Sequence, residues 1–382
     1  IAPPYDVVDI HEARNLAKDK PYSFLRISRA ELEFPFDTNP YSDTVYERAA
    51  NNLTEFQTKG ILLKDKTPGY YVYRISNETH SQTGLAVAAS IEAYKNNRIK
   101  RHELTRTSKE EDRIKQIKAT RAQTGPVMLV NRNSASLRQL LKEICSSANA
   151  SNKASLNGWV HEIWPILDNE KINKFSMLIN QMESLYIADG HHRSAAAEKV
   201  FHDLECEHDG FLAVIFDENE LNILDYNRVV RGLNHLDPIA FLKRLNEFFA
   251  LEKSSRPVLP RNANTYGLYL DSSWYKLRLK NPPFSQNPID KLDVSIIQNL
   301  VLDPILSIKD SRIDDRIDFV GGSRGPEGIM NRVDSGEMTA GFMMPATSIS
   351  ELLMVADLGK TMPPKSTWFE PKLADGLLTL LI

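Results

Sequence analysis

With 382 residues, of which 42% are hydrophobic and 25% charged, the chain has the composition of an ordinary globular protein and the length of two or three domains. The net charge of −3 gives no reason to expect nucleic acid as a partner, and no apolar run approaches the roughly 20 residues that span a bilayer. The two cysteines, Cys145 and Cys206, exclude a disulfide framework or a paired-cysteine zinc site, and they favour a reducing, cytoplasmic location.

The first half of the chain predicts helices and strands without an internal repeat. The helices are predicted from apolar residues at helical spacing. The strands are predicted from runs rich in β-branched and aromatic residues. In chain order we expect a helix at 11–18, a helix at 46–60, strands at 70–75 and 84–91, a highly charged stretch at 101–121 and a buried strand at 127–130. A Gln-Thr-Gly-Pro turn separates the charged stretch from the buried strand.

The second half continues the mixture. We expect a helix at 137–144, a strand at 159–166, a helix at 172–182, a strand at 185–188, a helix at 194–204, a hairpin of 211–216 with 221–224, a helix from 238 to about 251, a hairpin of 266–270 with 274–279, a helix at 289–300, a strand at 339–344 and a helix at 349–358. Strands and helices alternate without a regular βαβ rhythm. The sequence therefore predicts a mixed α/β or α+β fold.

The most distinctive segment is Ala-Asp-Gly-His-His-Arg at 188–193, which joins a predicted strand to a predicted helix. A helix start presents free backbone N–H groups and the positive end of the helix dipole, which favour an anion. Arg193 can bind phosphate with two parallel hydrogen bonds, Asp189 can hold a cation or accept a proton, and a histidine can shuttle one near neutral pH. The alternative is an ordinary helix start capped by Asp189. We interpret residues 189–193, called the polar turn below, as a phosphate-handling site.

A second polar segment reads Arg-His-Glu-Leu-Thr-Arg at 101–106 and is followed by further charged residues. Ser108 and Glu111 have the spacing of a capping box, which predicts a helix from Lys109 onward. On that helix Lys109 and Arg113 share a face. A carboxylate flanked by a histidine and several cations suits a general base that acts on a phosphoryl acceptor. A solvated charged helix is the equally weighted alternative.

A third segment reads Met-Pro-Pro-Lys-Ser-Thr-Trp-Phe-Glu-Pro-Lys at 362–372. Its Lys-Ser-Thr is similar to part of a phosphate loop, but the required glycines are absent. A rigid loop that packs its two aromatic residues into the core is the alternative. We expect at least one of its polar residues, Lys365, Ser366, Thr367 or Lys372, to reach the polar turn and clamp phosphate or substrate.

These segments occur together, in the same order, in one prokaryotic family. They are Ala-Pro-Pro-Tyr-Asp-Val-Val at the start, His-Glu-Leu-Thr at 102–105, Gln-Thr-Gly-Pro at 123–126, the segment 188–193, Tyr-Asn-Arg at 226–228 and Met-Pro-Pro-Lys-Ser-Thr at 362–367. Over essentially its whole length the chain resembles the family catalogued as domain of unknown function 1015. The name of that family supplies no reaction.

The polar turn is also similar to the turn of free-serine kinases of the ParB/sulfiredoxin-like fold, which phosphorylate L-serine with a nucleotide. This resemblance implies a strand, a glycine-centred turn and a phosphate-binding helix start, beside an earlier strand that residues 124–127 would begin. It implies Glu103 as the base, with Lys109 or Arg113 as the basic residue near it. The spacing differs, because Glu103 and Asp189 are 86 residues apart (189 − 103), longer than in the compact kinases.

The resemblance implies three segments and a reaction. A ParB/sulfiredoxin-like core at 99–236 would follow an N-terminal α+β segment at 1–98 and precede an α/β segment at 237–382 that closes the site. The expected reaction is nucleotide-dependent phosphoryl transfer to a small hydroxyl metabolite, serine or a relative. ATP or ADP would be the donor, with Mg²⁺ as cofactor.

The expected roles of individual residues follow from this reaction. Catalytic roles are expected for Glu103, Asp189 and His191, with Asp189 also binding the metal. The expected phosphate- and nucleotide-binding residues are Gly190, His192, Arg193, Arg106, Lys109, Arg113, Lys365, Ser366, Thr367 and Lys372. The expected substrate-binding residues are His102, Thr105 and Arg228.

Two other functions stay open. A nucleotide-binding regulatory module without small-molecule turnover would match the ParB proteins, which use bound nucleotide as a switch. The chain shows no basic surplus or helix-turn-helix to support it. A metal-dependent hydrolase would use Asp189, His191, His192 and His102. Adjacent histidines at a helix start point about 100° apart and seldom bind one metal together, so this function ranks lowest.

Overall fold

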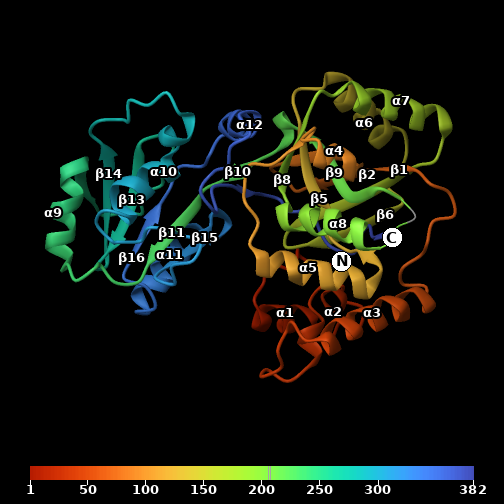
Figure 1. Ribbon diagram of the computed structural model, residues 1–382, viewed down its shortest axis with the longest axis horizontal. Helices are drawn as coiled ribbons and strands as arrows, with labels where there is room; N and C mark the ends of the chain where they lie inside the picture. Colours follow the sequence, from red (N-terminus) through yellow and green to blue (C-terminus); the bar gives the residue numbers. More distant parts are fainter. Residues whose placement is uncertain (205, 207) are drawn as a thin grey trace. The chain divides into compact units, whose positions relative to one another are not determined.

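The computed structural model describes residues 1–204, 206 and 208–382, and it contains two compact units. The first unit comprises residues 1–221 and 371–382, and the second comprises residues 222–370. Figure 1 shows helices and strands mixed within each unit, which confirms the predicted mixed α/β class. These units divide the chain differently from the three predicted segments, because strands on both sides of residue 98 pair in one sheet.

An eight-stranded sheet forms the centre of the first unit, with the strand order β3-β8-β5-β9-β2-β1-β7-β6. Its strands are β1 (Tyr70–Ser76), β2 (Ser81–Ser90), β3 (Ile99–Lys100), β5 (Val127–Asn131), β6 (Asn152–Leu156), β7 (Trp159–Ile166), β8 (Leu185–Asp189) and β9 (Gly210–Asp217). The pairs β3 with β8 and β5 with β9 are parallel, and the other neighbours are antiparallel. The short strands β4 (Ala122–Gln123) and β18 (Leu380–Leu381) pair with each other.

Helices cover both faces of this sheet. The helices of this unit are α1 (Ile10–Ala17), α2 (Leu25–Ser28), α3 (Asp43–Thr58), α4 (Ile91–Lys95), α5 (Thr107–Thr120), α6 (Ala135–Ser147), α7 (Asn169–Gln181) and α8 (His191–Asp203). Figure 1 shows α6 and α7 together on one side, and α5 with the N-terminal helices α1 to α3 on the other. Helix α5 contacts both α3 and α8. None of the described helices is both long and apolar enough to cross a membrane.

The spacing of apolar residues explains how these layers pack. In α6 the side chains of Leu137, Leu140, Leu141 and Ile144 recur at helical spacing and are all buried. They belong to one apolar cluster with the sheet residue Leu129. Every residue of β5 and of β9 is buried, because helices cover both faces of the sheet at its centre.

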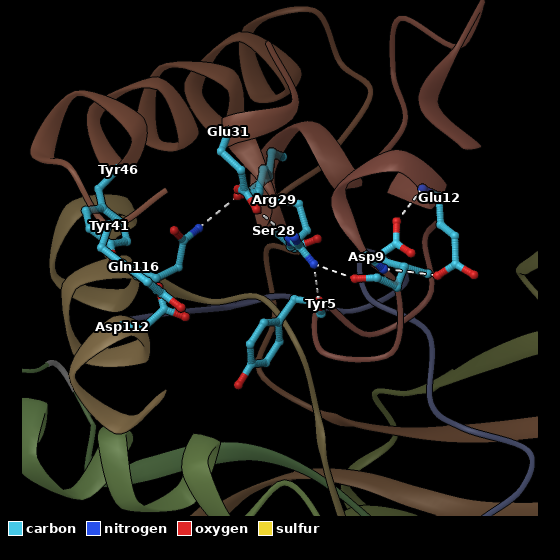
Figure 2. A network of polar contacts seen from close by, with 12 residues as sticks. Tyr5, Asp9, Glu12, Ser28, Arg29, Glu31, Tyr41, Tyr46, Asp112 and Gln116 are labelled. Atoms are coloured by element: carbon cyan, nitrogen blue, oxygen red, sulfur yellow. Dashed lines mark hydrogen bonds and ion pairs between the residues drawn. The ribbon is translucent and has the colours of Figure 1, made fainter. Parts of the chain in front are cut away.

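A polar network joins the N-terminal segment to α5. Arg29 donates a hydrogen bond of 2.9 Å from Nη1 to the backbone carbonyl of Tyr5, and the Tyr46 hydroxyl donates one of 2.8 Å to Asp112 (Figure 2). The Asp112 carboxylate also accepts two hydrogen bonds from the Arg113 guanidinium, at 2.8 and 3.1 Å. The N-terminal helices therefore fix the position of the charged residues on α5.

The second unit contains a six-stranded antiparallel sheet of order β12-β14-β13-β16-β11-β15 and a two-stranded sheet of β10 with β17. The strands are β10 (Ile223–Leu224), β11 (Tyr226–Val230), β12 (Phe249–Ser254), β13 (Thr265–Leu270), β14 (Ser273–Leu279), β15 (Ile317–Gly321), β16 (Ala340–Met343) and β17 (Trp368–Phe369). The helices are α9 (Pro238–Phe248), α10 (Asp293–Ile297), α11 (Gly325–Asp334) and α12 (Ile349–Asp357). Helix α11 packs on one sheet face through Ile329, which joins Val229 and Val320 in an apolar cluster.

Two local predictions in the second half are wrong. The segments 211–216 and 221–224 form no hairpin, because β9 pairs with β2 and β5 whereas β10 pairs with β17. The predicted helix at 289–300 is interrupted: a 3-10 turn at Pro288–Lys291 precedes α10, and a π-helical turn at Gln298–Leu302 follows it. The hairpin does not form because its two segments pair with strands that are distant in the sequence. No local sequence pattern predicts such pairing.

The predicted capping box on α5 is also wrong. The helix begins at Thr107, two residues before the predicted start, and no side-chain hydrogen bond caps it. Ser108 and Glu111 are therefore the second and fifth residues of the helix and cannot act as cap and third helical residue. Residue spacing alone does not distinguish a cap position from a position inside the helix.

The buried sheet predicts a sharp contrast between two leucines. Leu129 on β5 is 0% exposed, whereas Leu63 in the first unit is 82% exposed. We expect Leu129→Ala to lower the free energy of unfolding by about 2–5 kcal/mol, because it removes buried methyl groups and leaves a cavity. Leu63→Ala should change it by less than about 0.5 kcal/mol. Thermal or urea unfolding of both variants tests this, and equal destabilisation would contradict the position of β5 in the core.

Candidate functional site

The polar turn lies where a strand ends and a helix begins, as predicted. Strand β8 ends at Asp189, helix α8 begins at His191, and Gly190 between them has a positive φ of 102°. No side-chain hydrogen bond caps the helix, which rules out Asp189 as its cap. A Cβ atom on Gly190 would lie 3.1 Å from the Arg193 Nε and 3.2 Å from the Val127 Cα. The turn therefore requires glycine both for its backbone angle and for its close packing.

Strand pairing brings the segment 101–106 to the polar turn. Strand β3 runs parallel to β8, with Ile99 beside Leu185 and Lys100 beside Tyr186. Because the carboxyl ends of parallel strands meet at the same edge, the residues after Lys100 lie beside the residues before Gly190. The His192 Nε2 accepts a hydrogen bond of 2.9 Å from the Arg106 backbone N–H, which joins the segment to α8.

Two cations balance the charge of Asp189. The Arg193 Nη2 donates a hydrogen bond of 2.7 Å to the Asp189 Oδ2, and the Lys372 Nζ lies 3.7 Å from its Oδ1. Burial by itself would raise the pKa of this carboxyl, but Lys372 and Arg193 hold that pKa well below its ordinary value. One polar residue of the 362–372 segment thus reaches the polar turn, as expected.

Arg193 also holds the Gln-Thr-Gly-Pro turn against α8. Its Nη1 donates a hydrogen bond to the Pro126 carbonyl. Strand β5, which follows that turn, pairs with β8 so that Met128 lies opposite Asp189, and the register shifts between Met128 and Leu129, as it does at a β-bulge. Bulges often redirect side chains beside functional sites. The predicted position of the 124–127 turn and strand beside β8 agrees with this pairing.

Two buried histidines and one glutamate gather at the edge of the polar turn. The rings of His102 and His191 stack edge to face with centroids 4.5 Å apart, and the two side chains are 1% and 6% exposed. One ligand atom from each of His102, Glu103 and His191 lies within 4.8 Å of the others. Neither ring nitrogen of His102, nor Nε2 of His191, has a well-aligned hydrogen-bond partner among the described residues. These three residues could hold a divalent metal or a polar substrate.

Burial keeps both histidines neutral near pH 7. It lowers the pKa of His102 to about 4 and lowers the pKa of His191 well below its ordinary value. The mutual repulsion of the two rings adds to the shift of His191, whereas Asp189 opposes it. A neutral imidazole can accept a proton, donate one hydrogen bond or bind a metal ion.

Three other predicted residues near this segment make contacts within the protein. The Thr105 hydroxyl donates a hydrogen bond of 2.7 Å to Glu110, which also pairs with Lys199. Lys109 is half-buried on α5, with its Nζ 3.5 Å from the Tyr41 hydroxyl. Arg113 is buried, binds Asp112 through two hydrogen bonds and lies 3.7 Å above the Tyr5 ring. Arg113 therefore joins α5 to the N-terminal segment.

Four predicted residues belong to the second unit. The Ser366 hydroxyl donates a hydrogen bond of 2.6 Å to the Pro363 carbonyl, and the Ser366 carbonyl accepts one of 2.8 Å from Thr347. Arg228 is 3% exposed. Lys365 has a positive φ of 56°, and Thr367 is half-buried. For these residues a role in binding phosphate or substrate stays a prediction.

Asp375 is a residue of this region that the sequence did not indicate. It is 2% exposed, its Oδ1 has no hydrogen-bond partner among the described residues, and burial raises its pKa to about 7 although Arg193 opposes this. With Tyr5, Arg113 and Arg193 it lines a cavity of about 20 Å³, which has room for about one water molecule. Its neighbours in the sequence are apolar or glycine, so no local motif marks it.

Comparison with known families identifies the chain. The family model described as "Protein of unknown function (DUF1015)" matches residues 1–295, a range that includes the segment 101–106 and the polar turn. The chain belongs to this family. No curated protein matches it significantly. Membership in DUF1015 confirms the resemblance of the sequence motifs and leaves the reaction open.

Several solved structures resemble the chain weakly. A mutant free serine kinase in complex with AMP has 14% identity and a TM-score of 0.43, with 84% of this chain and 96% of the kinase covered. C-terminally truncated SbnI from Staphylococcus aureus has 12% identity and a TM-score of 0.41, with coverages of 76% and 85%. A conserved hypothetical protein from Pyrococcus furiosus has 14% identity and a TM-score of 0.38, with coverages of 76% and 93%. Similarities this low assign no activity.

The geometry of the polar turn predicts unequal effects of two glycine substitutions. Gly190 and Gly158 both have positive φ, at 102° and 81°, but nothing lies within 4 Å of a Cβ on Gly158. We expect Gly158→Ala to lower the stability of the protein by about 1 kcal/mol through backbone strain alone. Gly190→Ala should lower it further, because its methyl group meets Arg193 and Val127. Equal shifts in thermal unfolding temperature would contradict the close packing of the turn.

The buried histidines predict a loss of stability in mild acid. The pKa of His102 is about 4 in the folded protein, below the ordinary histidine pKa of 6.5, so between these pH values the unfolded chain binds more protons at this residue than the folded protein. Its contribution to stability is therefore complete above about pH 6.5 and is lost as the pH falls toward 4. We expect His102→Gln to show a flatter dependence of unfolding temperature on pH than the wild type.

The control for that measurement is His202→Gln, which changes a histidine whose side chain is 49% exposed. It should retain the pH dependence of the wild type. If His102→Gln retains it as well, the pKa of His102 is the same in the folded protein as in the unfolded chain.

Proposed function

We propose that the protein transfers a phosphoryl group from ATP or ADP to the hydroxyl of a small metabolite, serine or a similar compound, with a ParB/sulfiredoxin-like first unit. The observation that carries the proposal is the start of α8, which no side chain caps and which lies beside the Glu103 carboxylate. Phosphoryl transfer depends on positioning and charge neutralisation more than on covalent chemistry by the enzyme. In this proposal the start of α8 binds the anion and the neighbouring Glu103 is the carboxylate base.

The donor phosphates would bind at the start of α8. The first backbone N–H groups of a helix have no partner within the helix, and the helix dipole favours negative charge there. Arg193 uses one N–H each on Pro126 and Asp189, which leaves three of its five donors for phosphate. His192 and Lys372 would complete this side of the site.

The acceptor hydroxyl would bind beside Glu103. In this proposal the Glu103 carboxylate accepts the proton of the hydroxyl as its oxygen attacks the terminal phosphorus of the donor. The phosphoanhydride bond to that phosphorus breaks and ADP or AMP leaves, while His191 or His102 holds the hydroxyl through a neutral imidazole. Both histidines lie close enough to Glu103 to contact the same small group. Their neutral state avoids a competing positive charge that would draw the acceptor oxygen away from phosphorus.

Mg²⁺ is the proposed cofactor, with Asp189 as its protein ligand. The Asp189 Oδ2 accepts a short hydrogen bond from Arg193, but the Lys372 Nζ is 3.7 Å from Oδ1, longer than a hydrogen bond. Oδ1 is therefore the atom that fits a cation. When bound, Mg²⁺ would neutralise charge on the donor phosphates.

A metal-dependent hydrolase is a second candidate, because His102, Glu103 and His191 form a set of ligand atoms of the right kind and spacing. This set differs from the predicted one. It includes Glu103 in place of Asp189, and it omits His192, whose Nε2 accepts a hydrogen bond from Arg106. His191 and His192 thus have different contact partners, because adjacent residues on a helix point in different directions.

Phosphorus-31 spectroscopy would test the reaction. The protein would be incubated with ATP or ADP, Mg²⁺ and a pool of hydroxyl metabolites that includes serine. New phosphomonoester signals would support the proposal. Release of inorganic phosphate without transfer would favour the hydrolase, and nucleotide binding without turnover would favour the regulatory module.

Substitution of Glu103 would separate the base from the binding residues. We expect Glu103→Gln to lower kcat by about 10²–10⁴-fold and to leave nucleotide affinity nearly unchanged, because it keeps the size of the side chain and removes its basicity. Lys372→Met should instead weaken nucleotide binding by about ten- to hundredfold. Calorimetric titration and steady-state rates provide both quantities.

Glu92→Gln is the matched control, since the Glu92 side chain is 68% exposed on α4. It should change neither rate nor affinity. Equal loss of nucleotide affinity in Glu103→Gln and Lys372→Met would make Glu103 a binding residue. Full activity of Glu103→Gln would place the base elsewhere.

A further inference from the structure

Arg228 in the second unit is a buried cation without an acidic partner. Its side chain lies on β11 and the residue is 3% exposed. Among the described residues it forms no ion pair, and its hydrogen bond runs from Nη1 to the Tyr226 carbonyl. A buried charge without a counter-charge costs several kcal/mol of stability. Burial lowers the pKa of Arg228 to about 10, so the guanidinium still carries its charge at pH 7.

An aromatic cluster surrounds this guanidinium. Tyr226 precedes Arg228 by two residues on β11, so both side chains lie on the same sheet face, and Phe319 lies directly across from Arg228 on β15. The Arg228 guanidinium carbon is 5.6 Å from the centre of the Phe319 ring. The Tyr226 ring contacts both Phe319 and Trp368 edge to face, at centroid distances of 5.9 and 5.2 Å. We call Tyr226, Phe319 and Trp368 the aromatic cluster.

Close packing holds this cluster in place. The Trp368 ring lies directly on the backbone of Gly321, where a Cβ atom would approach the ring to 2.5 Å. The Trp368 indole N–H donates a hydrogen bond of 3.0 Å to Glu370. On the opposite face of the sheet Val229 and Ile329 form an apolar core. The aromatic cluster therefore lies on the other face of β11 from that core, where Arg228 is paired across the sheet with Phe319 and Phe342.

A second cation lies on the same cluster. The Lys365 Nζ is 5.6 Å from the centre of the Tyr226 ring. Lys365 has a positive φ of 56°, a conformation that is strained for a residue with a side chain and that occurs often at ligand-binding sites. The neighbouring Ser366 fixes this conformation, since its hydroxyl donates to the Pro363 carbonyl and its own carbonyl accepts from Thr347.

We propose that Arg228 and Lys365 form an oxyanion site in the second unit that binds the phosphate group of a small ligand, with the aromatic cluster as its wall. A guanidinium matches phosphate through two parallel hydrogen bonds, and an ammonium adds a point charge. The anion would supply the counter-charge that Arg228 lacks among the described residues. The proposal is independent of the proposed reaction, because all of its residues lie in the second unit and it requires no turnover.

The test uses the full chain and measures thermal unfolding in buffer without oxyanions, then with added inorganic phosphate or AMP. Both additions should raise the unfolding temperature of the wild type, because a ligand that binds the folded protein stabilises it. A larger effect of AMP at equal concentration would show that the aromatic cluster contacts the rest of the ligand. Equal effects would restrict recognition to the phosphate group.

Arg228→Met provides the decisive comparison, because it keeps a long side chain and removes the charge. Without oxyanions this variant should be more stable than the wild type, since an unpaired buried charge is lost. Its affinity for phosphate in calorimetric titration should fall at least tenfold. Arg244→Gln, which removes an exposed arginine from α9 of the same unit, should behave as the wild type.

Three results would overturn the proposal. The first is an Arg228→Met variant that responds to phosphate as strongly as the wild type. The second is an oxyanion-free Arg228→Met variant less stable than the wild type, which would show that the guanidinium is satisfied within the protein. The third is a phosphate response that disappears in Lys372→Met and persists in Arg228→Met, which would place the anion at the polar turn alone.

Discussion

The Arg193 guanidinium is the contact on which the rest of the site depends. It donates to Asp189 at the end of β8 and to the Pro126 carbonyl before β5, while its own backbone belongs to the first turn of α8. One planar group thus fixes a strand end, a turn and a helix start relative to one another. A Cβ atom on residue 190 would lie 3.1–3.2 Å from the Arg193 side chain. The packing therefore allows little variation at Gly190.

Charge balance differs between the two units. In the first unit the buried cations have acidic partners: Arg193 and Lys372 balance Asp189, and Arg113 pairs with Asp112. The cost of burying each of these charges is offset by hydrogen bonds within the protein. Arg228 in the second unit has no such partner among the described residues. The rule that a buried charge needs a counter-charge is therefore met within the first unit. In the second unit it is not met for Arg228 by the described residues.

Neutral histidines beside a carboxylate define the chemistry available at the polar turn. Burial removes the charge of His102 and His191, while Arg193 and Lys372 keep Asp189 ionised. Neutral and charged groups a few ångströms apart can then take different roles near the same pH. The arrangement suits a reaction in which a proton leaves a hydroxyl while negative charge is held at the helix start.

Local sequence patterns predicted much of what is local in the structure. Helical spacing located α3 and α6, alternation and β-branched residues located β7 and β13, and the glycine in the 188–193 segment marked the junction of β8 with α8. The sequence by itself also determined which side chains the polar turn offers. It did not locate the start of α5 or the break after residue 291, because both depend on packing against distant elements.

Only the tertiary structure decided which residues meet at the site. Parallel pairing of β3 with β8 brings Glu103 to His191, and the return of residues 371–382 to the first unit brings Lys372 to Asp189. Asp375 arrives in the same way, although its neighbours in the sequence carry no signal. Such contacts join segments far apart in the chain and are stabilised by the whole sheet. Residue spacing reports only local geometry and therefore cannot predict these long-range contacts.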